Sequence, residues 1–269
     1  MRTRKNKKYL SWNNKCKLSI ALSFVGTIIF FAIPYARVVY YSLIRNQFNR
    51  KFVGLSNYIK TLSNPYFLLA LKNSILLIVI GVPILIILSL LLSLILAYKS
   101  PRVKRFKTAF ILPMLIPTAS IVLSWNVFFS HIDNSMPIYL LFIWKNIGIC
   151  IILMSSALTG IDEDLFEAAS LEGIRGHQIH RYITVPLISP TIFFTTLLSI
   201  VNSFKIFKES YLYYGGNYPP NYSYTLQYYM NNNFLKLDYQ SLATSAILTS
   251  LLILFIVIWG IRIQSKYEF

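Results

Sequence analysis

Residues whose side chains could carry out chemistry are few in this sequence of 269 residues, and most lie in one polar segment. Five of the nine acidic residues fall in this segment, namely Asp162, Glu163, Asp164, Glu167 and Glu172. His177 and His180 come next at a spacing of three, so on a helix the two imidazoles could meet and ligate a metal. An ordinary pair of polar loop residues explains the same spacing, and we predict no metal site.

The motifs give no support to enzymatic chemistry. The sequence has no Gly-x-x-x-x-Gly-Lys-Ser/Thr segment that would bind a nucleotide phosphate, and no Gly-x-Ser-x-Gly segment that would present a nucleophile. Cys16 and Cys150 are too few for a disulfide framework, and neither indicates a redox role. We therefore predict that the chain is not an enzyme and holds no cofactor of its own.

The acidic segment is predicted to form a short helix. Asp162 suits the N-cap position, and acids in the first turn favour the positive end of the helix dipole. Gly173 suits the left-handed residue that commonly ends a helix, and a second helical stretch is expected from His177 to Pro186. Such a helix could dock on another protein or remain a solvated loop helix. Its predicted apolar face consists of Leu165, Phe166, Ala169 and Leu171.

The rest of the chain has the composition of a membrane protein. It is 55% hydrophobic and 13% charged, with a mean hydropathy of +0.55, which is too apolar for a soluble domain. We predict an all-α membrane protein in which a basic tail over residues 1–17 precedes a single transmembrane domain over residues 18–269. A span takes ~20 apolar residues as a helix, and six stretches qualify: about 18–44, 70–98, 108–130, 136–158, 183–206 and 242–263.

The distribution of basic residues predicts the orientation. Lys and Arg are about twice as frequent in the tail and connections on the N-terminal side of the membrane as in those on the other side, and the positive-inside rule then puts both termini in the cytoplasm. The acidic segment between the fourth and fifth spans would also be cytoplasmic. The net charge of +17 fits basic loops facing anionic lipid headgroups better than it fits a nucleic-acid surface.

The acidic segment resembles the coupling loop of ABC-importer permeases, in which Glu-Ala-Ala, three residues and Gly precede an Ile-x-Leu-Pro-like end. Here the matching residues are Glu167-Ala168-Ala169-Ser170-Leu171-Glu172-Gly173 and Ile183-Thr184-Val185-Pro186. Further elements are similar, in order, to those of the maltose/glycerol-phosphate permease group, including Phe52-Val53-Gly54-Leu55-Ser56-Asn57-Tyr58, Ala70-Leu71-Lys72-Asn73-Ser74, Phe110-Ile111-Leu112-Pro113, Ile143-Trp144-Lys145-Asn146, Ser203-Phe204-Lys205-Ile206-Phe207 and Gly215-Gly216.

This resemblance implies a multi-pass permease of a bacterial plasma membrane, with a second permease, two ATPase subunits that bind ATP, and an extracellular solute-binding protein as partners. The implied solute is a carbohydrate, mostly an oligosaccharide in this group, with glycerol phosphate or another small polar solute as the alternative. The sequence departs from the pattern at Glu172, Ile174 and Val185, and near 131–135 the outer connection is shortened. The implied coupling residues are Glu167, Ala168, Ala169, Leu171 and Gly173.

Polar residues within the predicted spans could line a solute path. Neutral amide and hydroxyl groups can exchange hydrogen bonds with sugar hydroxyls, although bonding between helices is an equally simple role for them. Lys145 could belong to the path or could serve helix packing. A secondary transporter is the main rival from another class, but no carboxylate lies in any predicted span. The candidate path residues are Asn202, Ser203, Lys205 and Phe207.

Tyrosines gather in the last outer loop, between the fifth and sixth predicted spans. A tyrosine ring can stack on a sugar or anchor a binding protein. Tyrosine is also common at the ends of spans, where it sits at the membrane–water interface. Both interpretations remain open for Tyr211, Tyr213, Tyr214, Tyr218, Tyr222, Tyr224, Tyr228, Tyr229 and Tyr239.

Overall fold

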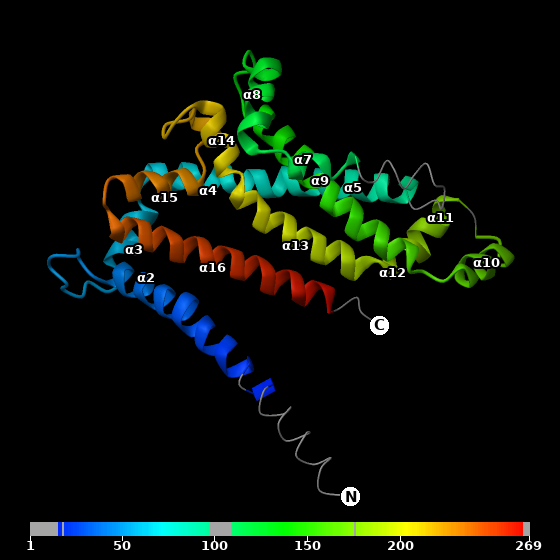
Figure 1. Cartoon of the computed structure of the whole chain (residues 1–269), viewed down its shortest axis with the longest axis horizontal. Coiled ribbons are helices and arrows are strands. Elements are labelled where there is room, and N and C mark those ends of the chain that lie inside the picture. The colour runs from blue at the N-terminus through cyan, green and yellow to red at the C-terminus, as the bar shows by residue number, and fades with distance from the viewer. Residues whose placement is uncertain (1–15, 18, 97–108, 175, 266–269) are drawn as a thin grey trace, which may run out of the picture. The chain divides into compact units, whose positions relative to one another are not determined.

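The computed structural model describes residues 16–17, 19–96, 109–174 and 176–265, and these residues are helical almost throughout (Figure 1). Apart from helices they form an isolated antiparallel bridge between Ile44 and Phe52. By length and composition, five helical segments could cross a membrane: Ser19–Leu43, Pro65–Leu96, Met136–Thr159, Ser189–Tyr214 and Tyr239–Gln264. The prediction of an all-α membrane protein is confirmed, whereas residues 1–15 of the predicted basic tail, 1–17, lie outside the described residues.

The chain divides into two compact units, one comprising residues 1–62 and 233–248 and the other residues 63–232 and 249–269. In the first unit, η1 (Ile28–Ala32), α2 (Ile33–Leu43) and α3 (Ser56–Leu62) precede the start of α16 (Tyr239–Gln264). The second unit holds α4 (Pro65–Leu76), η2 (Leu77–Gly81), α5 (Val82–Leu96), α7 (Leu112–Leu115), α8 (Thr118–Phe129), α9 (Met136–Thr159), α10 (Glu163–Leu171), α11 (His177–Ile179), η3 (His180–Thr184), α12 (Val185–Leu187), α13 (Ser189–Lys205), α14 (Phe207–Tyr214), η4 (Asn221–Ser223), most of α15 (Leu226–Leu235) and the end of α16.

In the first unit, the segment after the first span supplies hydrogen-bond donors to the C-terminal end of α2. The side-chain amide of Asn57 donates to the carbonyls of Ser42 and Ile44, at 2.9 Å each. Tyr58 reaches the hydroxyl of Ser42 at 2.8 Å. The N–H of Val53 also donates to the carbonyl of Leu43 at 2.9 Å. The last carbonyls of a helix have no partner inside it, and this segment supplies partners for three carbonyls at this end.

The second unit is built around α9, which packs against both α5 and α13. Leu85 of α5 and Ile151 and Met154 of α9 are fully buried. Gly148 allows a close approach, because a Cβ at this position would lie 1.9 Å from the carbonyl oxygen of Phe110. The Phe-x-Leu-Pro element is thereby packed directly against the backbone of α9.

The third predicted span, 108–130, is interrupted in the structure. Residue 108 lies outside the described part, and the remainder divides into α7 and α8 at Ile116 and Pro117. Pro117 has no N–H and forces the residue before it out of the helical region, and Ile116 has an extended ψ of 136°. At 12 residues, α8 is about 18 Å long, which is short for a hydrocarbon core of ~30 Å. Six spans therefore stay a prediction, with five long enough in the structure.

The fifth span is predicted over 183–206, and the structure places both of its ends later in the sequence, at Ser189 and Tyr214. Residues from His177 to Leu187 form a separate helical stretch, as predicted, and a new helix starts at Ser189 with Pro190 in its first turn, where proline is well tolerated. Helix α14 continues the apolar segment to Tyr214. Glu209 therefore lies inside a candidate span, and the prediction that spans lack carboxylates is wrong.

Three π-helical turns interrupt the described helices, and each ends two residues before a proline. Residues Ile28–Ala32 precede Pro34, Leu77–Gly81 precede Pro83, and His180–Thr184 precede Pro186. A proline ring clashes with the carbonyl four residues earlier and donates no hydrogen bond. A locally wider turn accommodates the ring, so the position of each proline in the sequence determines where the π-helical turn occurs.

Candidate functional sites

Helix α10 forms in the acidic segment, where the sequence predicts it. Asp162 occupies the N-cap position with an extended backbone, but its side chain makes no capping hydrogen bond. Glu163 and Asp164 lie in the first turn. Their carboxylates still favour the positive end of the helix dipole, so charge stabilises the start of this helix.

The C-terminal end of α10 is fixed by backbone geometry. Gly173 has a φ of +85°, in the left-handed region that glycine adopts without strain. The N–H of Ile174 donates to the carbonyl of Ala169 at 3.0 Å, and that of Gly173 donates to Ser170 at 3.1 Å. This pair of bonds is the Schellman motif, and the predicted helix end at Gly173 is confirmed.

The implied coupling residues lie mostly on the surface of the unit. Glu167, Ala168 and Gly173 are exposed, and Leu171 is 91% exposed. Ala169 is buried, so it does not share a face with Leu171, and the apolar face predicted for the helix is divided. A shallow hollow beside Leu171 is lined by Phe166, Glu167 and Ser170. An exposed leucine next to a hollow and a carboxylate is a surface that another protein could cover.

A second candidate site is a cavity of about 380 Å³ between α9 and the α13–α14 segment. Asn202 and Lys205, two of the four candidate path residues, line this cavity. Its full lining is Met114, Lys145, Asn146, Ile149, Leu198, Asn202, Lys205, Ile206 and Glu209. The lining combines amides and charges with aliphatic side chains.

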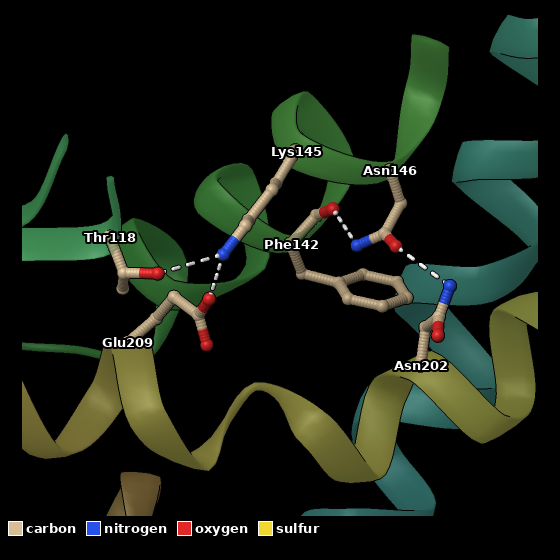
Figure 2. A network of polar contacts seen from close by, with 6 residues as sticks. All are labelled: Thr118, Phe142, Lys145, Asn146, Asn202 and Glu209. Atoms are coloured by element: carbon tan, nitrogen blue, oxygen red, sulfur yellow. Dashed lines mark hydrogen bonds and ion pairs between the residues drawn. The ribbon is translucent and has the colours of Figure 1, made fainter. Parts of the chain in front are cut away.

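Lys145 forms an ion pair with Glu209 across this cavity (Figure 2). Thr118 also accepts a hydrogen bond from the ammonium group at 3.2 Å, so the contact joins α8, α9 and α14. Both charged side chains are largely buried, at 21% and 6% exposure. The sequence interpretation of Lys145 lacked this partner, because Glu209 lies beyond the predicted end of the fifth span.

Two amides bridge α9 and α13 beside the ion pair. The side-chain nitrogen of Asn202 donates to the side-chain oxygen of Asn146 at 3.1 Å (Figure 2). Asn146 in turn donates to the backbone carbonyl of Phe142 at 2.8 Å. Asn202 thus has an interhelical hydrogen bond and also lines the cavity, so the two roles considered for it are compatible.

The other two candidate path residues do not line the cavity. Ser203 is buried, and its hydroxyl donates to the carbonyl of Ile200 within its own helix at 2.7 Å. The ring of Phe207 packs against Tyr211 and Tyr228, with centroid distances of 5.5 and 4.9 Å.

Most tyrosines of the segment between α13 and α16 pack against one another. Tyr228 is fully buried and stacks with Tyr211 and Tyr224. Burial raises the pKa of the Tyr224 phenol above its ordinary value. Tyr218 is 77% exposed and remains available to a ligand or partner.

No group of three or more His, Cys, Asp or Glu side chains could hold a metal ion within the part of the chain that the structure describes. His180 lies near the hydroxyl of Thr184, with a distance of 3.4 Å between Nδ1 and Oγ1. His180 therefore has a local polar contact in the helical stretch after α10.

Comparison with known proteins identifies the family. Residues 89–266 match the family model described as binding-protein-dependent transport system inner membrane component. The chain belongs to this family. The region matched includes both the α10 segment and the cavity, and the chain is therefore a multi-pass membrane component of a transport system, as the sequence predicts.

Curated relatives are similar over most of their length. An arabinooligosaccharides transport system permease protein of Halalkalibacterium halodurans is 25% identical, over 88% of this chain and 81% of the relative. An sn-glycerol-3-phosphate transport system permease protein of Agrobacterium fabrum is 26% identical, over 93% and 94%. A chain from the crystal structure of a bacterial ABC transporter involved in the import of the acidic polysaccharide alginate matches with a TM-score of 0.75 and 20% identity, over 97% and 99%. The last likeness confirms the permease fold.

Proposed function

We propose that this chain is a membrane-spanning permease subunit of an ATP-driven ABC importer, and that it translocates a carbohydrate delivered by an extracellular solute-binding protein. The family description and the names of the relatives support the transport class and the carbohydrate substrate. An oligosaccharide is the preferred substrate. Glycerol phosphate is the alternative, because one of the similar permeases carries that name.

The observation that carries the proposal is α10. It is a short helix with a sharply defined end and an exposed face, within the matched region. In the proposed mechanism this helix docks on an ATPase subunit in the cytoplasm. ATP binding closes the ATPases, and the movement of α10 changes the side of the membrane to which the solute path opens.

The proposed assembly contains a second permease, two ATPase subunits and the binding protein, with ATP bound by the ATPases. This chain supplies the solute path and the mechanical connection and catalyses no chemistry. Both of its termini are cytoplasmic in this arrangement. The positive-inside distribution of basic residues supports the orientation, and the exposure of Glu167 and Leu171 supports docking of α10.

The proposal is tested by reconstituting the complete complex in lipid vesicles, with the binding protein outside and ATP inside. We expect ATP-dependent uptake of labelled oligosaccharides. Uptake that continues without ATP but requires an ion gradient would instead indicate a secondary transporter. Uptake of amino acids or peptides, with no response to any carbohydrate, would contradict the substrate class and leave the fold unaffected.

A further inference from the structure

The cavity beside α9 carries an unbalanced positive charge. Three of its lining residues are charged, namely Lys145, Lys205 and Glu209. Glu209 is paired with Lys145, so these two charges compensate one another. Lys205 is exposed at the cavity and has no hydrogen-bond or ion-pair partner among the residues that the structure describes.

We propose that this cavity binds an anionic, hydroxyl-rich solute, and that Lys205 contacts its carboxylate or phosphate group. This inference rests on the proposed function and narrows its substrate class from carbohydrates in general to acidic ones. A neutral solute that covered Lys205 would displace water from its ammonium group and supply no countercharge. An anionic group on the solute compensates that charge and accepts a charge-assisted hydrogen bond.

The remaining lining residues suit the rest of such a solute. Asn146 and Asn202 present amides that can hydrogen bond to hydroxyl groups, and their mutual bond holds them in place. Ile149, Leu198 and Ile206 provide aliphatic surface for the carbon face of a ring. The charge on Lys205 therefore selects an anionic solute, while the other lining residues contact the hydroxyl groups and the carbon face of a sugar ring.

Because the charges of Lys145 and Glu209 compensate one another, Lys205 determines the net charge of the cavity. If Glu209 were absent, Lys145 would add a second positive charge to the same cavity. If both members of the pair were neutral, the net charge of the cavity would be unchanged. This relation separates an effect of cavity charge from an effect of losing one particular side chain.

The test uses the full complex in vesicles, with three labelled probes: a uronic-acid trisaccharide, a neutral trisaccharide of the same length, and glycerol phosphate. Both anionic probes carry a negatively charged group next to hydroxyl groups. Comparing their uptake distinguishes an acidic oligosaccharide from a small polyol phosphate as the solute. We expect the native complex to take up one anionic probe in preference to the neutral one. Lys205→Gln should reduce the apparent affinity for that probe by about ten- to hundredfold, the range of a hydrogen bond to a charged group.

Three further variants make the test specific. Lys205→Arg should restore most of the uptake. The double variant Lys145→Met with Glu209→Gln alters the cavity lining and is expected to lower uptake, but anionic uptake should still exceed neutral uptake because the net charge is unchanged. Lys208→Gln removes an exposed lysine from the next turn that does not line the cavity, and it should behave as the native protein. Membrane abundance of each variant is measured by immunoblotting.

Two results would overturn the inference. One is an equal effect of Lys205→Gln and Lys208→Gln on uptake of the anionic probe. The other is uptake of the neutral trisaccharide in preference to both anionic probes, which would retain the proposed importer but reject an acidic substrate. Failure to transport any of the three probes, combined with uptake of amino acids or peptides, would reject the proposed function itself.

Discussion

At the scale of single residues, the contact between Lys145 and Glu209 shows how a charge is accommodated inside an apolar helix bundle. Each charge alone would carry a large desolvation cost in this environment. The ion pair and the hydrogen bond to Thr118 offset part of that cost, and these contacts join α8, α9 and α14. Its effect on stability is therefore best measured by changing both partners.

Removing one partner of this pair is expected to be more harmful than removing both. Glu209→Gln leaves the Lys145 ammonium group buried without an anion, and we expect a loss of about 3–5 kcal/mol in stability. The double variant with Lys145→Met should recover most of that loss. A double-mutant cycle on the thermal unfolding of the purified chain in detergent measures the coupling, and additive effects of the two substitutions would show that the pair does not interact.

The amide of Asn202 gives a second prediction at this scale. Asn202→Leu keeps a similar bulk but removes hydrogen bonding to Asn146 and to a solute. Each bond lost should cost about 0.5–1.5 kcal/mol, or roughly a few-fold to tenfold in uptake. Ser203→Ala removes a hydroxyl that bonds within its own helix, and uptake by this variant should change less than twofold. Equal losses in the two variants, measured in vesicles, would place Ser203 in the path as well.

The residue scale also shows what could not be predicted from the sequence. Lys145 attracts attention because a charge inside a span needs a partner, and the candidate path residues Asn202 and Lys205 line the cavity. The partner of Lys145 could not be identified, because Glu209 is 64 residues away and only the three-dimensional fold joins the two. Ser203 and Phe207 have suitable chemistry, but their direction depends on helix packing that local sequence does not determine.

At the scale of elements, α10 is well predicted because its signals are local. An N-cap residue, acids in the first turn and a terminal glycine all act within one short segment, and each occurs where expected. The limits of the third and fifth spans are predicted less well. Hydropathy does not register the break at Pro117, or the continuation of apolar helix through α14 into a segment with several polar residues.

The end of α10 yields a prediction about docking. Gly173→Val places a β-branched residue at a φ of +85°, at a cost of roughly 1–2 kcal/mol that the helix end can avoid by unwinding. The chain should still insert in the membrane, but co-purification of the ATPase and solute uptake should both fall severalfold.

A matched control is Gly216→Val, at a glycine that has open space around it and no positive φ. This variant should assemble and transport as the native chain does. If Gly173→Val retained normal association with the ATPase, α10 would be a surface helix with no role in coupling.

At the scale of the whole molecule, the orientation predicted from charge remains to be measured. In a chain with Cys16 and Cys150 replaced by serine, single cysteines at Ser170 and Ser265 should react with an impermeant maleimide only from the cytoplasmic side. A cysteine at Asn221 should react only from outside. All three positions belong to described residues, and Ser170, Asn221 and Ser265 are exposed. Labelling of position 170 from outside would make docking on a cytoplasmic ATPase impossible.

The π-helical turn before Pro186 has a consequence for how movement crosses the second unit. Each residue of a helix turns the next side chain by about 100° around its axis, so a wide turn acts as an angular offset between the helical segments on its two sides. The turn His180–Thr184 lies between α10 and α13. It therefore offsets α11 from α12 in rotation, within the stretch that connects α10 to the helix carrying Asn202 and Lys205. Without the proline, a regular α-helix could form there, and in the proposed mechanism a movement of α10 would then reach α12 with a different rotation.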